Sequence, residues 1–422
     1  MRNILIGHRA ERDILASGDY VPREGVAEAR AAMAGGLIKV ITGPRRAGKS
    51  VFAFQMLAGT DFAYVNFDDE RLYGLTDFDE LIKAAVQVYG ETKTFLFDEI
   101  QNIERWELFV SRLHRQGYNI LLTGSNAHLL GRELATHLTG RYREFRILPF
   151  SFGEFLSART FSLDDLPGRK ERQGLLLAHL HDYMSQGGFP EVVVKGADAH
   201  SYLATLFESV LFKDIVRRYG IRQTQRLHDL GTWLVSNTAR EYTLTSLKNS
   251  LAFGSVHTVE NYLGYMAETF LLFSLSRFSW KAKERTKAPR KVYCYDTGMV
   301  KAVRFRSGAD TGRLLENVVA VELARRGEVF HCWKEAAGKE VDFVVRREAG
   351  TAELIQVCYD LSEQKTRKRE IQALIAAAGS LQGGSLTVLT WDEEGEESSD
   401  AGPVRLIPTW KWLLGIEKSW CE

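Results

Sequence analysis

The sequence lacks the features that mark a secreted or membrane protein. Its four cysteines, Cys294, Cys332, Cys358 and Cys421, form no CxxC or other metal-binding spacing, and a chain of this length needs no disulfide bridges to fold. The N-terminal segment MRNILIGHRAERDIL has scattered charges in place of the apolar core of a signal peptide, and no run of eighteen apolar residues occurs. We therefore expect a soluble protein of the reducing cytoplasm, with no membrane partner.

The sequence also lacks a strong charge of either sign. A formal net charge of +1 excludes a uniformly basic nucleic-acid-binding protein, so any contact with DNA must come from a local patch. With 422 residues, 45% hydrophobic and 11% aromatic, the chain can bury sizeable cores and is long enough for two to four domains.

A glycine-rich loop between a strand and a helix indicates a phosphate-binding site. The strand-like run LIKVIT is followed by GPRRAGKS and then by the helical pattern VFAFQMLAG, which is the order that a P-loop requires. The glycines let backbone N–H groups turn towards a phosphate, and the helix N-terminus adds its positive dipole end. Lys49 would reach the β- and γ-phosphates, and Ser50 would offer its hydroxyl to Mg²⁺. The residues predicted to bind ATP are Gly43, Pro44, Arg45, Arg46, Ala47, Gly48, Lys49, Ser50 and Val51.

A second apolar strand ends in two acidic residues. In TFLFDEIQNIERW the strand from Thr94 to Phe97 runs into Asp98 and Glu99. An acidic turn after a buried strand would look the same in isolation, but its position downstream of the phosphate loop favours a Walker B strand. Asp98 would hold Mg²⁺ through water, and Glu99 would orient or activate the attacking water. The sequence therefore predicts ATP and Mg²⁺ as cofactors.

A third strand, NILLTGSN, ends in polar residues. We expect it to lie between the first two strands, so that Ser125 or Asn126 acts as a sensor of the γ-phosphate or of the attacking water. Arg141 follows a glycine and precedes a strand, which suits an arginine finger or a nucleotide sensor. A solvated basic cluster with Arg143 and Arg146 is the alternative for this arginine. The predicted catalytic set is Lys49, Asp98, Glu99, Asn126 and Arg141, with Ser50 and Asp98 as metal ligands.

Seven stretches occur in a fixed order along the chain: RRAGKS, YVNFDDE, FDEIQNIERWE, LLTGSN, LTGR, LPFSFGEF and QGGFPEVV. In this order they resemble the bacterial and archaeal AAA-type ATPases that carry a C-terminal domain of unknown function, which are similar to the archaeal and STAND-like branch of P-loop ATPases. The resemblance covers nearly the whole chain. It implies ATP binding and hydrolysis, a winged-helix segment and a restriction-endonuclease-like C-terminal fold, and it supplies no substrate.

From residue 241 the pattern changes to two short helices and two strands, which predicts a helix-turn-helix with a β-wing. The second helix would expose His257, Glu260 and Asn261, where base edges are usually read. Between the strands, residues 281–291 contain six Lys or Arg against one Glu, which would pair with DNA phosphates or the minor groove. A winged helix that binds protein is the alternative, and Glu260 on the reading face favours it.

The last third has the order helix–strand–strand–strand–helix of a restriction-endonuclease-like core. Glu316, Asp342 and Gln356 stand where metal ligands of such a nuclease would stand. Cys358 occupies the usual lysine position, and a thiol cannot orient the attacking water or offset transition-state charge. Lys365 on the next helix is the alternative candidate for the role of the missing lysine, although an exposed position fits it better. We therefore expect a fold without appreciable nuclease activity.

The predicted fold class is α/β: a P-loop NTPase parallel sheet with a helical lid, a winged helix and a C-terminal restriction-endonuclease-like α/β domain. The expected bounds are 1–160 for the ATPase core, 161–235 for the lid, 236–305 for the winged helix and 306–422 for the last domain. We expect residues 392–400, DEEGEESSD, to form a solvated acidic loop.

Three functions fit these features. The first is an ATP-hydrolysing switch or motor that associates with double-stranded DNA, and the others are a nucleotide-switched protein scaffold and an ATP-dependent, metal-requiring nuclease. A homo-oligomer is expected, because an arginine finger often acts across a subunit interface.

Overall fold

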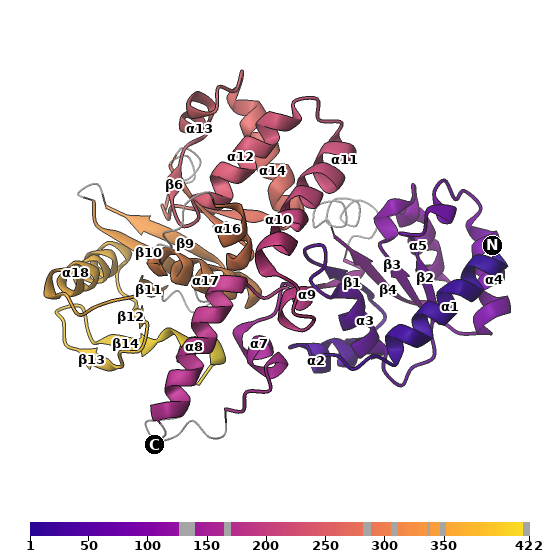
Figure 1. Ribbon diagram of the computed structural model, residues 1–422, viewed down its shortest axis with the longest axis horizontal. Coiled ribbons are helices and arrows are strands. Elements are labelled where there is room, and N and C mark those ends of the chain that lie inside the picture. Colours follow the sequence, from indigo (N-terminus) through magenta and orange to yellow (C-terminus); the bar gives the residue numbers. More distant parts are fainter. Residues whose placement is uncertain are drawn as a thin grey trace. The chain divides into compact units, whose positions relative to one another are not determined.

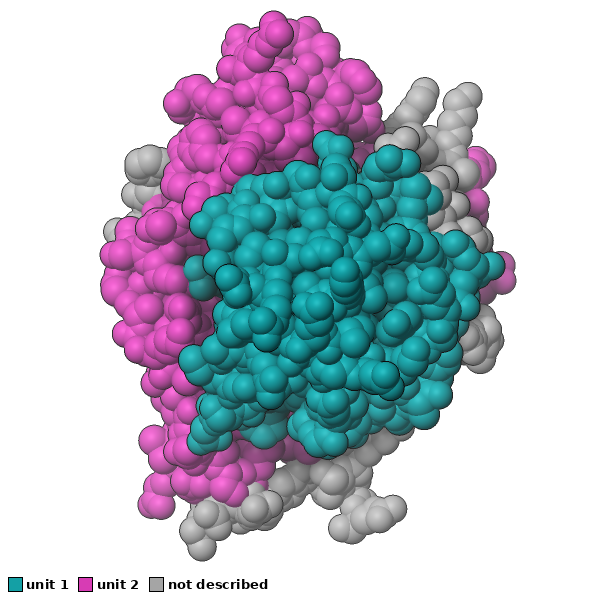
Figure 2. Space-filling model, turned by 90° about the vertical axis from the view of Figure 1, so that its right-hand side faces the viewer, with its two compact units in different colours: residues 1–150, 268–270 teal, residues 151–267, 271–422 magenta. Residues whose placement is uncertain are grey.

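The structure, a computed structural model, describes residues 1–125, 140–163, 170–281, 288–304, 311–335, 338–346 and 352–416. The chain forms two compact units, coloured separately in Figure 2: unit 1 is residues 1–150 and 268–270, and unit 2 is residues 151–267 and 271–422. The finer division into four domains stays a prediction. Among the described residues, none of the helices combines the length and the hydrophobicity that crossing a bilayer demands.

Unit 1 is built on a five-stranded parallel sheet with the strand order β2-β3-β4-β1-β5 (Figure 1). The strands are β1 (Ile38–Thr42), β2 (Ala63–Asn66), β3 (Thr94–Asp98), β4 (Asn119–Gly124) and β5 (Tyr142–Arg146). The prediction that the third polar-ended strand lies between the other two is confirmed, because β4 pairs with both β1 and β3. The carboxyl ends of these three strands therefore meet at one edge of the sheet.

The sheet of unit 1 has an apolar core on each face. Phe95 and Phe97 of β3 pack with α4 and α5, whereas Leu96 packs with α3, because successive side chains of a strand point to opposite faces. The side chain of Asp77 caps the first N–H groups of α4. The helices are α1 (Arg2–Ala16), α2 (Val26–Ala31), α3 (Lys49–Leu57), α4 (Phe78–Tyr89) and α5 (Trp106–Arg115), with the 3₁₀ turns η1 (Ala32–Ala34), η2 (Glu70–Leu72) and η3 (Ile100–Asn102).

Unit 2 begins with helices. A capping box formed by Ser151 and Glu154 starts the first of them, and the predicted helical stretch 200–219 appears as three consecutive segments, the middle one a π-helix. The segments are α7 (Phe152–Ala158), α8 (Lys170–Gln186), α9 (Pro190–Val193), α10 (Ala199–Ser209), η4 (Val210–Val216), α11 (Arg217–Tyr219) and α12 (Thr224–Ser236).

A small antiparallel sheet with the strand order β6-β8-β7 follows α12 in the chain. Two helices lie between its first two strands in sequence, so the order is helix–strand–helix–helix–strand–strand. Val259, Leu263 and Met266 of the second helix are buried, as the sequence predicts. The elements are β6 (Glu241–Tyr242), α13 (Leu244–Ser250), α14 (Val256–Glu268), β7 (Leu272–Ser276), β8 (Arg290–Cys294) and α16 (Thr297–Val303).

The last part of unit 2 is a six-stranded mixed sheet with the order β13-β14-β12-β11-β10-β9. Leu354 of β11 packs with α18 and its neighbour Ile355 with α17, so a helix covers each face (Figure 1). The predicted order helix–strand–strand–strand–helix is confirmed as α17-β9-β10-β11-α18. The elements are α17 (Thr311–Arg325), β9 (Phe330–Lys334), β10 (Glu340–Arg346), β11 (Ala352–Cys358), α18 (Gln364–Leu381), β12 (Ser385–Thr390), β13 (Gly395–Glu397), β14 (Val404–Pro408) and α19 (Thr409–Leu414).

The acidic segment 392–400 differs from its prediction as a solvated loop. Its middle residues form β13, which pairs antiparallel with β14. Glu393 and Glu397 form ion pairs with Arg367 of α18. Most of the segment is exposed, as expected, and the loop prediction is wrong only for the residues of β13. The ion pairs could not be expected, because Arg367 lies 26 and 30 residues earlier, on a helix whose local composition gives no sign of them.

Three cysteines fall within the described residues, and all are buried free thiols. Burial raises the pKa of Cys294 and of Cys332 to about 12. A thiol with such a pKa stays protonated at neutral pH and is a poor nucleophile.

Candidate functional site

The glycine-rich loop links the carboxyl end of β1 to the start of α3, as a P-loop does. A Cβ atom on Gly43, whose φ is +147°, would lie 1.9 Å from the carbonyl oxygen of Ile147. Gly48, directly before α3, has a φ of +91°. A side chain is therefore excluded at the first position and strained at the second, and the two glycines fix the path of the loop.

Arg23 supports this loop from a part of the sequence that carries no motif. One guanidinium nitrogen donates to the carbonyl oxygen of Ala47 at 2.7 Å and another to that of Leu148 at 2.7 Å. The side chain is buried, and its charge lies 5.0 Å from the centre of the Phe150 ring. Sequence analysis missed Arg23, because a residue that holds a loop through backbone carbonyls leaves no spacing pattern.

Lys49, the first residue of α3, is only 5% exposed. Its ammonium donates to the carbonyl oxygen of Pro44 at 3.1 Å and lies 3.6 Å from a carboxylate oxygen of Glu99. Neither contact is a close ion pair, so the ammonium can change partners without leaving a tightly bound carboxylate behind. The neighbouring Arg45 is half-buried and Arg46 is exposed with a φ of +67°.

Asp98, at the carboxyl end of β3, collects hydroxyl groups from three elements. The Ser50 hydroxyl donates to its two carboxylate oxygens at 3.0 and 2.9 Å, and the Tyr64 hydroxyl donates at 3.1 Å. The Thr123 hydroxyl donates to the same carboxylate. Burial, followed by the charge of Glu99, raises the pKa of Asp98. Tyr64 and Thr123 were missed by sequence analysis, although each lies within a quoted motif.

Glu99 adopts the left-handed conformation, with a φ of +52°, which is uncommon for a residue with a side chain and is frequent at functional sites. Its N–H group donates to the Thr123 hydroxyl at 3.0 Å, and its carboxylate accepts from the Gln101 amide. Burial alone would raise the pKa of Glu99, but the Lys49 ammonium and the hydrogen bonds of Gln101 and Ser125 outweigh it, so the pKa is lowered. Glu99 is therefore a carboxylate at neutral pH.

The donor set fits Mg²⁺ held together with a nucleotide. Ser50 and Asp98 supply hydroxyl and carboxylate oxygens, which are the ligands that Mg²⁺ prefers. In the described part of the chain, no group of three His, Cys, Asp or Glu side chains is arranged to hold a metal by itself. Such a site suits an ion that takes its remaining ligands from phosphate oxygens and water.

Of the two other predicted catalytic residues, Arg141 is not brought to this edge of the sheet. Asn126 lies outside the described residues. Arg141 precedes β5, where its carbonyl oxygen accepts from the N–H group of Ile38 at 2.9 Å, whereas the loop leaves β1 next to Arg146. These two ends of β5 are about 16 Å apart, at roughly 3.3 Å per residue. A role for Arg141 at the phosphate loop of its own chain is therefore unsupported, and a role across an interface stays a prediction.

A second cluster of charges lies in unit 2, where the nuclease-like metal ligands were predicted. Lys291 of β8 is 3% exposed, and its ammonium lies 3.0 Å from Glu316, 2.6 Å from Glu340 and 2.9 Å from Asp342. The Tyr293 hydroxyl donates to Glu316 at 2.7 Å. Two of the predicted metal ligands, Glu316 and Asp342, are thus brought together around a buried lysine ammonium, and a metal-binding role for them stays a prediction.

The remaining member of the predicted metal site also has protein partners. The amide nitrogen of Gln356 donates to Glu370 at 2.6 Å, and its amide oxygen accepts from the N–H group of Asp342 at 3.2 Å. Cys358 is buried and Lys365 is exposed, so neither supplies a cation to the cluster. The predicted basic wing, residues 281–291, included Lys291. For this residue the prediction is wrong, since a buried lysine paired with carboxylates cannot contact phosphates.

The predicted reading helix is α14. His257 and Glu260 are exposed and Asn261 is half-buried, which leaves these side chains available at the start of the helix. The basic residues Lys283, Arg285 and Lys287 of the predicted wing lie outside the described residues.

Comparisons with known proteins agree with the phosphate-loop geometry. Residues 36–156 match the family described as an AAA domain, and residues 177–310 and 311–409 match two domains of unknown function, DUF8612 and DUF4143. An uncharacterised protein of Methanocaldococcus jannaschii is 36% identical over 397 residues, which cover 89% of this chain and 88% of that protein. An uncharacterised protein of Haemophilus influenzae is 33% identical over 345 residues, covering 77% and 83%. Among solved structures, a Walker-type ATPase of Pyrococcus abyssi aligns with a TM-score of 0.43 and 14% identity, covering 68% of this chain and 96% of that one.

Proposed function

Because this chain belongs to a family of AAA-domain P-loop ATPases, we propose that it binds ATP and hydrolyses it with Mg²⁺. One observation carries the proposal. Two partly buried pairs, Lys49 with Glu99 and Ser50 with Asp98, lie beside each other at the carboxyl ends of β1 and β3. This is the edge of a parallel α/β sheet where ligands bind.

The residues divide the work as follows. Lys49 exchanges its contacts with Pro44 and Glu99 for phosphate oxygens, and the loop N–H groups surround the phosphate. Ser50 and Asp98 hold Mg²⁺, which offsets the charge on the phosphates when bound. Glu99, freed from Lys49 and still ionised, accepts a hydrogen bond from the attacking water and orients it. Asn126 is proposed as the sensor that completes this arrangement.

Direct binding of ATP tests the proposal. Lys49→Ala should reduce ATP affinity at least tenfold, because a charge-assisted contact with phosphate is worth about 1.5–3 kcal/mol. Lys83→Ala, which removes an exposed lysine of α4 in the same unit, is the matched control and should bind ATP as the wild type does. Equal affinity in all three proteins would remove the phosphate loop from the proposal.

We propose that the region from α12 to β8 is a winged helix that associates with double-stranded DNA. Its support is the element order helix–strand–helix–helix–strand–strand and the exposed His257 at the start of α14, whereas the exposed Glu260 favours a protein partner. The ATP hydrolysis rate should rise with duplex DNA, and a tenfold rise corresponds to about 1.4 kcal/mol of barrier. A rate that is indifferent to DNA, in a protein that assembles with ATP, would favour the nucleotide-switched scaffold instead.

We propose that the ATPase acts as a homo-oligomer in which Arg141 is supplied to a neighbouring subunit. Its position at the far end of β5 from its own phosphate loop supports this. Hydrolysis per molecule should then fall on dilution as subunits separate. Constant specific activity over a wide dilution series, in a protein that sizes as a monomer with ATP, would contradict the idea.

We propose that the last part of unit 2 has a restriction-endonuclease-like fold that does not cleave DNA. The pairing of Lys291 with Glu316, Glu340 and Asp342 supports this, because it uses the acids that would hold a metal ion. Plasmid incubated with wild type and Mg²⁺ or Mn²⁺ should stay intact. Nicking that disappears in Asp342→Ala would contradict the proposal.

A further inference from the structure

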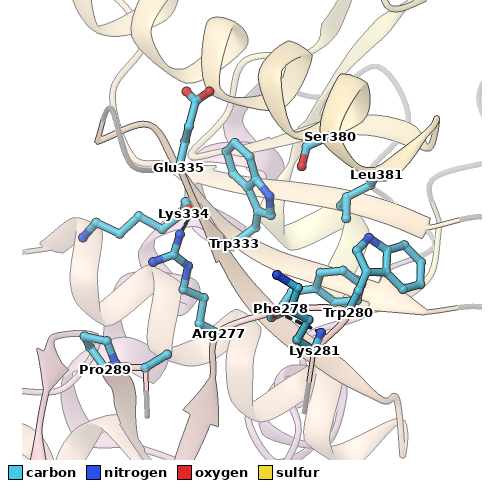
Figure 3. Close-up of a pocket in the computed structure, with 12 residues that line it drawn as sticks. Arg277, Phe278, Trp280, Lys281, Pro289, Trp333, Lys334, Glu335, Ser380 and Leu381 are labelled. Atoms are coloured by element: carbon cyan, nitrogen blue, oxygen red, sulfur yellow. Dashed lines mark hydrogen bonds between the residues drawn. The ribbon is translucent and has the colours of Figure 1, made fainter. Parts of the chain in front are cut away.

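Unit 2 contains an open cavity of about 840 Å³ at the end of β7 and the start of β8. Residues that follow β7 line one side, and the end of β9 with the C-terminal turn of α18 lines the other (Figure 3). Two hydrogen bonds join the two sides. The Phe278 N–H group donates to the Cys332 carbonyl oxygen at 2.6 Å, and the Arg277 side chain donates to the carbonyl oxygen of Lys334. The cavity is therefore a fixed feature within one unit.

Aromatic side chains dominate its lining. Trp333 is buried and forms part of the floor, while Trp280 is 71% exposed at the mouth. The Phe278 and Trp280 rings are nearly perpendicular, with centroids 5.1 Å apart and planes at 84°, so they do not stack face to face, and the exposed indole keeps surface for a ligand. An exposed tryptophan held beside a cavity marks a binding surface more often than an exposed aliphatic residue does.

The charges around the cavity favour an anionic ligand. Lys334 is already paired with Glu241 at 2.7 Å and Glu340 at 3.1 Å. The Arg277 side chain donates to a neutral carbonyl oxygen, and no carboxylate of the described residues forms an ion pair with it. Among the described residues of the lining, Arg277, Lys281 and Lys334 are basic and Glu335 is acidic.

Flat aromatic faces beside cations suit one class of macromolecule in particular. Single-stranded nucleic acid presents unpaired bases, which stack on aromatic rings, at regular intervals along a chain of phosphates. A cavity of this volume lies within the range that holds a ligand larger than a single side chain. An acidic peptide would satisfy the cations but would leave the indole face unused.

We propose that this cavity binds an unpaired nucleotide of a single DNA or RNA strand, with the base stacked on Trp280 and a phosphate beside Arg277. The inference deepens the DNA association proposed above and rests on it only for biological context.

Fluorescence anisotropy with a labelled oligo(dT) strand tests the proposal on the full-length protein. Trp280→Ala should weaken binding about tenfold to a hundredfold, the range expected for loss of one base–aromatic stack. Trp280→Phe should lose less, because a ring remains. Leu175→Ala, which removes an exposed apolar side chain of α8 outside the cavity, is the control and should bind normally. Because Trp280 is exposed, we do not expect Trp280→Ala to weaken binding by unfolding the protein. Equal melting temperatures of the variant and the wild type check this.

A second set of measurements separates the contribution of the base from that of the phosphate. Arg277→Gln should lower the salt dependence of oligo(dT) binding by about 0.7 units of slope, whereas Lys365→Gln should not. Lys365 lies at the other end of α18 from Leu381, about 24 Å along the helix axis. An abasic strand of equal length should bind the wild type and Trp280→Ala equally weakly.

The outcomes also separate this inference from the winged-helix proposal. Oligo(dT) binding that depends on Trp280, without duplex binding, would uphold the cavity and overturn the duplex-binding helix. Duplex binding that weakens in His257→Ala, with oligo(dT) affinity unchanged in Trp280→Ala, would do the reverse. Failure of the wild type to bind oligo(dT) would overturn the cavity proposal and leave a protein ligand as the occupant to test.

Discussion

Each unit buries a lysine among carboxylates, and the two lysines have different surroundings. Lys49 in unit 1 has one carboxylate at 3.6 Å and a carbonyl oxygen at 3.1 Å. Lys291 in unit 2 has three carboxylates, of Glu316, Glu340 and Asp342, all within 3.0 Å. A lysine with few and long contacts can transfer its charge to an incoming phosphate, whereas one that is fully paired acts as a fixed counter-ion.

The backbone around each lysine matches this difference. Lys49 follows a loop whose path depends on Gly43 and Gly48, and its ammonium contacts Pro44 and Glu99. Lys291 lies in the middle strand of a three-stranded sheet, paired on both sides by β6 and β7. The first lysine therefore follows an irregular loop, whereas the second is held within regular strand pairing.

The largest expected effect is on turnover in unit 1. Glu99→Gln should keep ATP binding and reduce hydrolysis about a hundredfold to ten-thousandfold, because the amide cannot take up a proton or orient water as a carboxylate does. A steady-state ATPase assay with separate measurement of ATP affinity checks this. Glu104→Gln, an exposed neighbour, should be indistinguishable from the wild type. Wild-type turnover in Glu99→Gln would mean that another group orients the water.

The next effect breaks the pairing in unit 2. Lys291→Met should lower the free energy of unfolding by about 3–5 kcal/mol, because it leaves buried carboxylates without a counter-ion. Denaturant unfolding followed by tryptophan fluorescence measures it, with Lys365→Met as the exposed control, for which we expect a change below about 0.5 kcal/mol. A loss of less than about 1 kcal/mol for Lys291→Met would show that the cluster hydrates readily and is no fixed pair.

The pH dependence of unit 2 sharpens the comparison further. Burial and the charge of Asp342 raise the pKa of Glu316 to about 7 from an ordinary value of 4.5, because one ammonium cannot offset all the acids around it. In this window the folded state holds a proton that the unfolded state has released, so stability falls as the pH rises from about 4.5 to about 7.

Glu316→Gln should remove this fall, which is on the order of 2 kcal/mol. The measurement is the free energy of unfolding of wild type and variant across pH 5 to 8. Parallel curves for the two proteins would show that Glu316 is ionised throughout. Glu353→Gln, a half-buried glutamate on β11, tests whether any glutamate of this sheet has the same effect.

The smallest effect concerns the Thr123 hydroxyl, which forms hydrogen bonds with both Asp98 and Glu99. Thr123 donates to Asp98 and accepts from the N–H group of Glu99, so Thr123→Val should cost about 1 kcal/mol of stability, the usual net worth of such a bond. Thr123→Ser keeps the hydroxyl and should lose less. Thermal unfolding of the two variants decides, and an equal loss in both would point to the methyl group instead.

Motifs that act through local sequence were predictable. The strand–loop–helix order, the acidic end of β3 and the place of β4 between β1 and β3 all follow from short stretches whose chemistry is contiguous. The roles assigned to Lys49, Asp98 and Glu99 stay predictions until activity is measured. The same holds for Asn126.

Residues that act across long sequence distances were not predictable. Lys291 was grouped with its basic neighbours, because its acidic partners lie 25 to 51 residues further along the chain. Arg23 contacts Leu148 across 125 residues. In both cases the partner is fixed by how elements pack, and neither a spacing nor a composition records it. The pattern of β8 could have indicated burial, since Lys291 and Tyr293 alternate with the apolar residues Val292 and Cys294.

Two buried thiols of unit 2 can serve as built-in probes of local opening. Cys294 lies on β8 and Cys332 on β9, and both stay protonated and inaccessible while these strands are folded. A thiol reagent can reach them only through local opening, so their rate of modification reports how often this sheet opens. Followed with and without nucleotide or DNA, the two rates would record how firmly ligands hold unit 2 closed, without any added label.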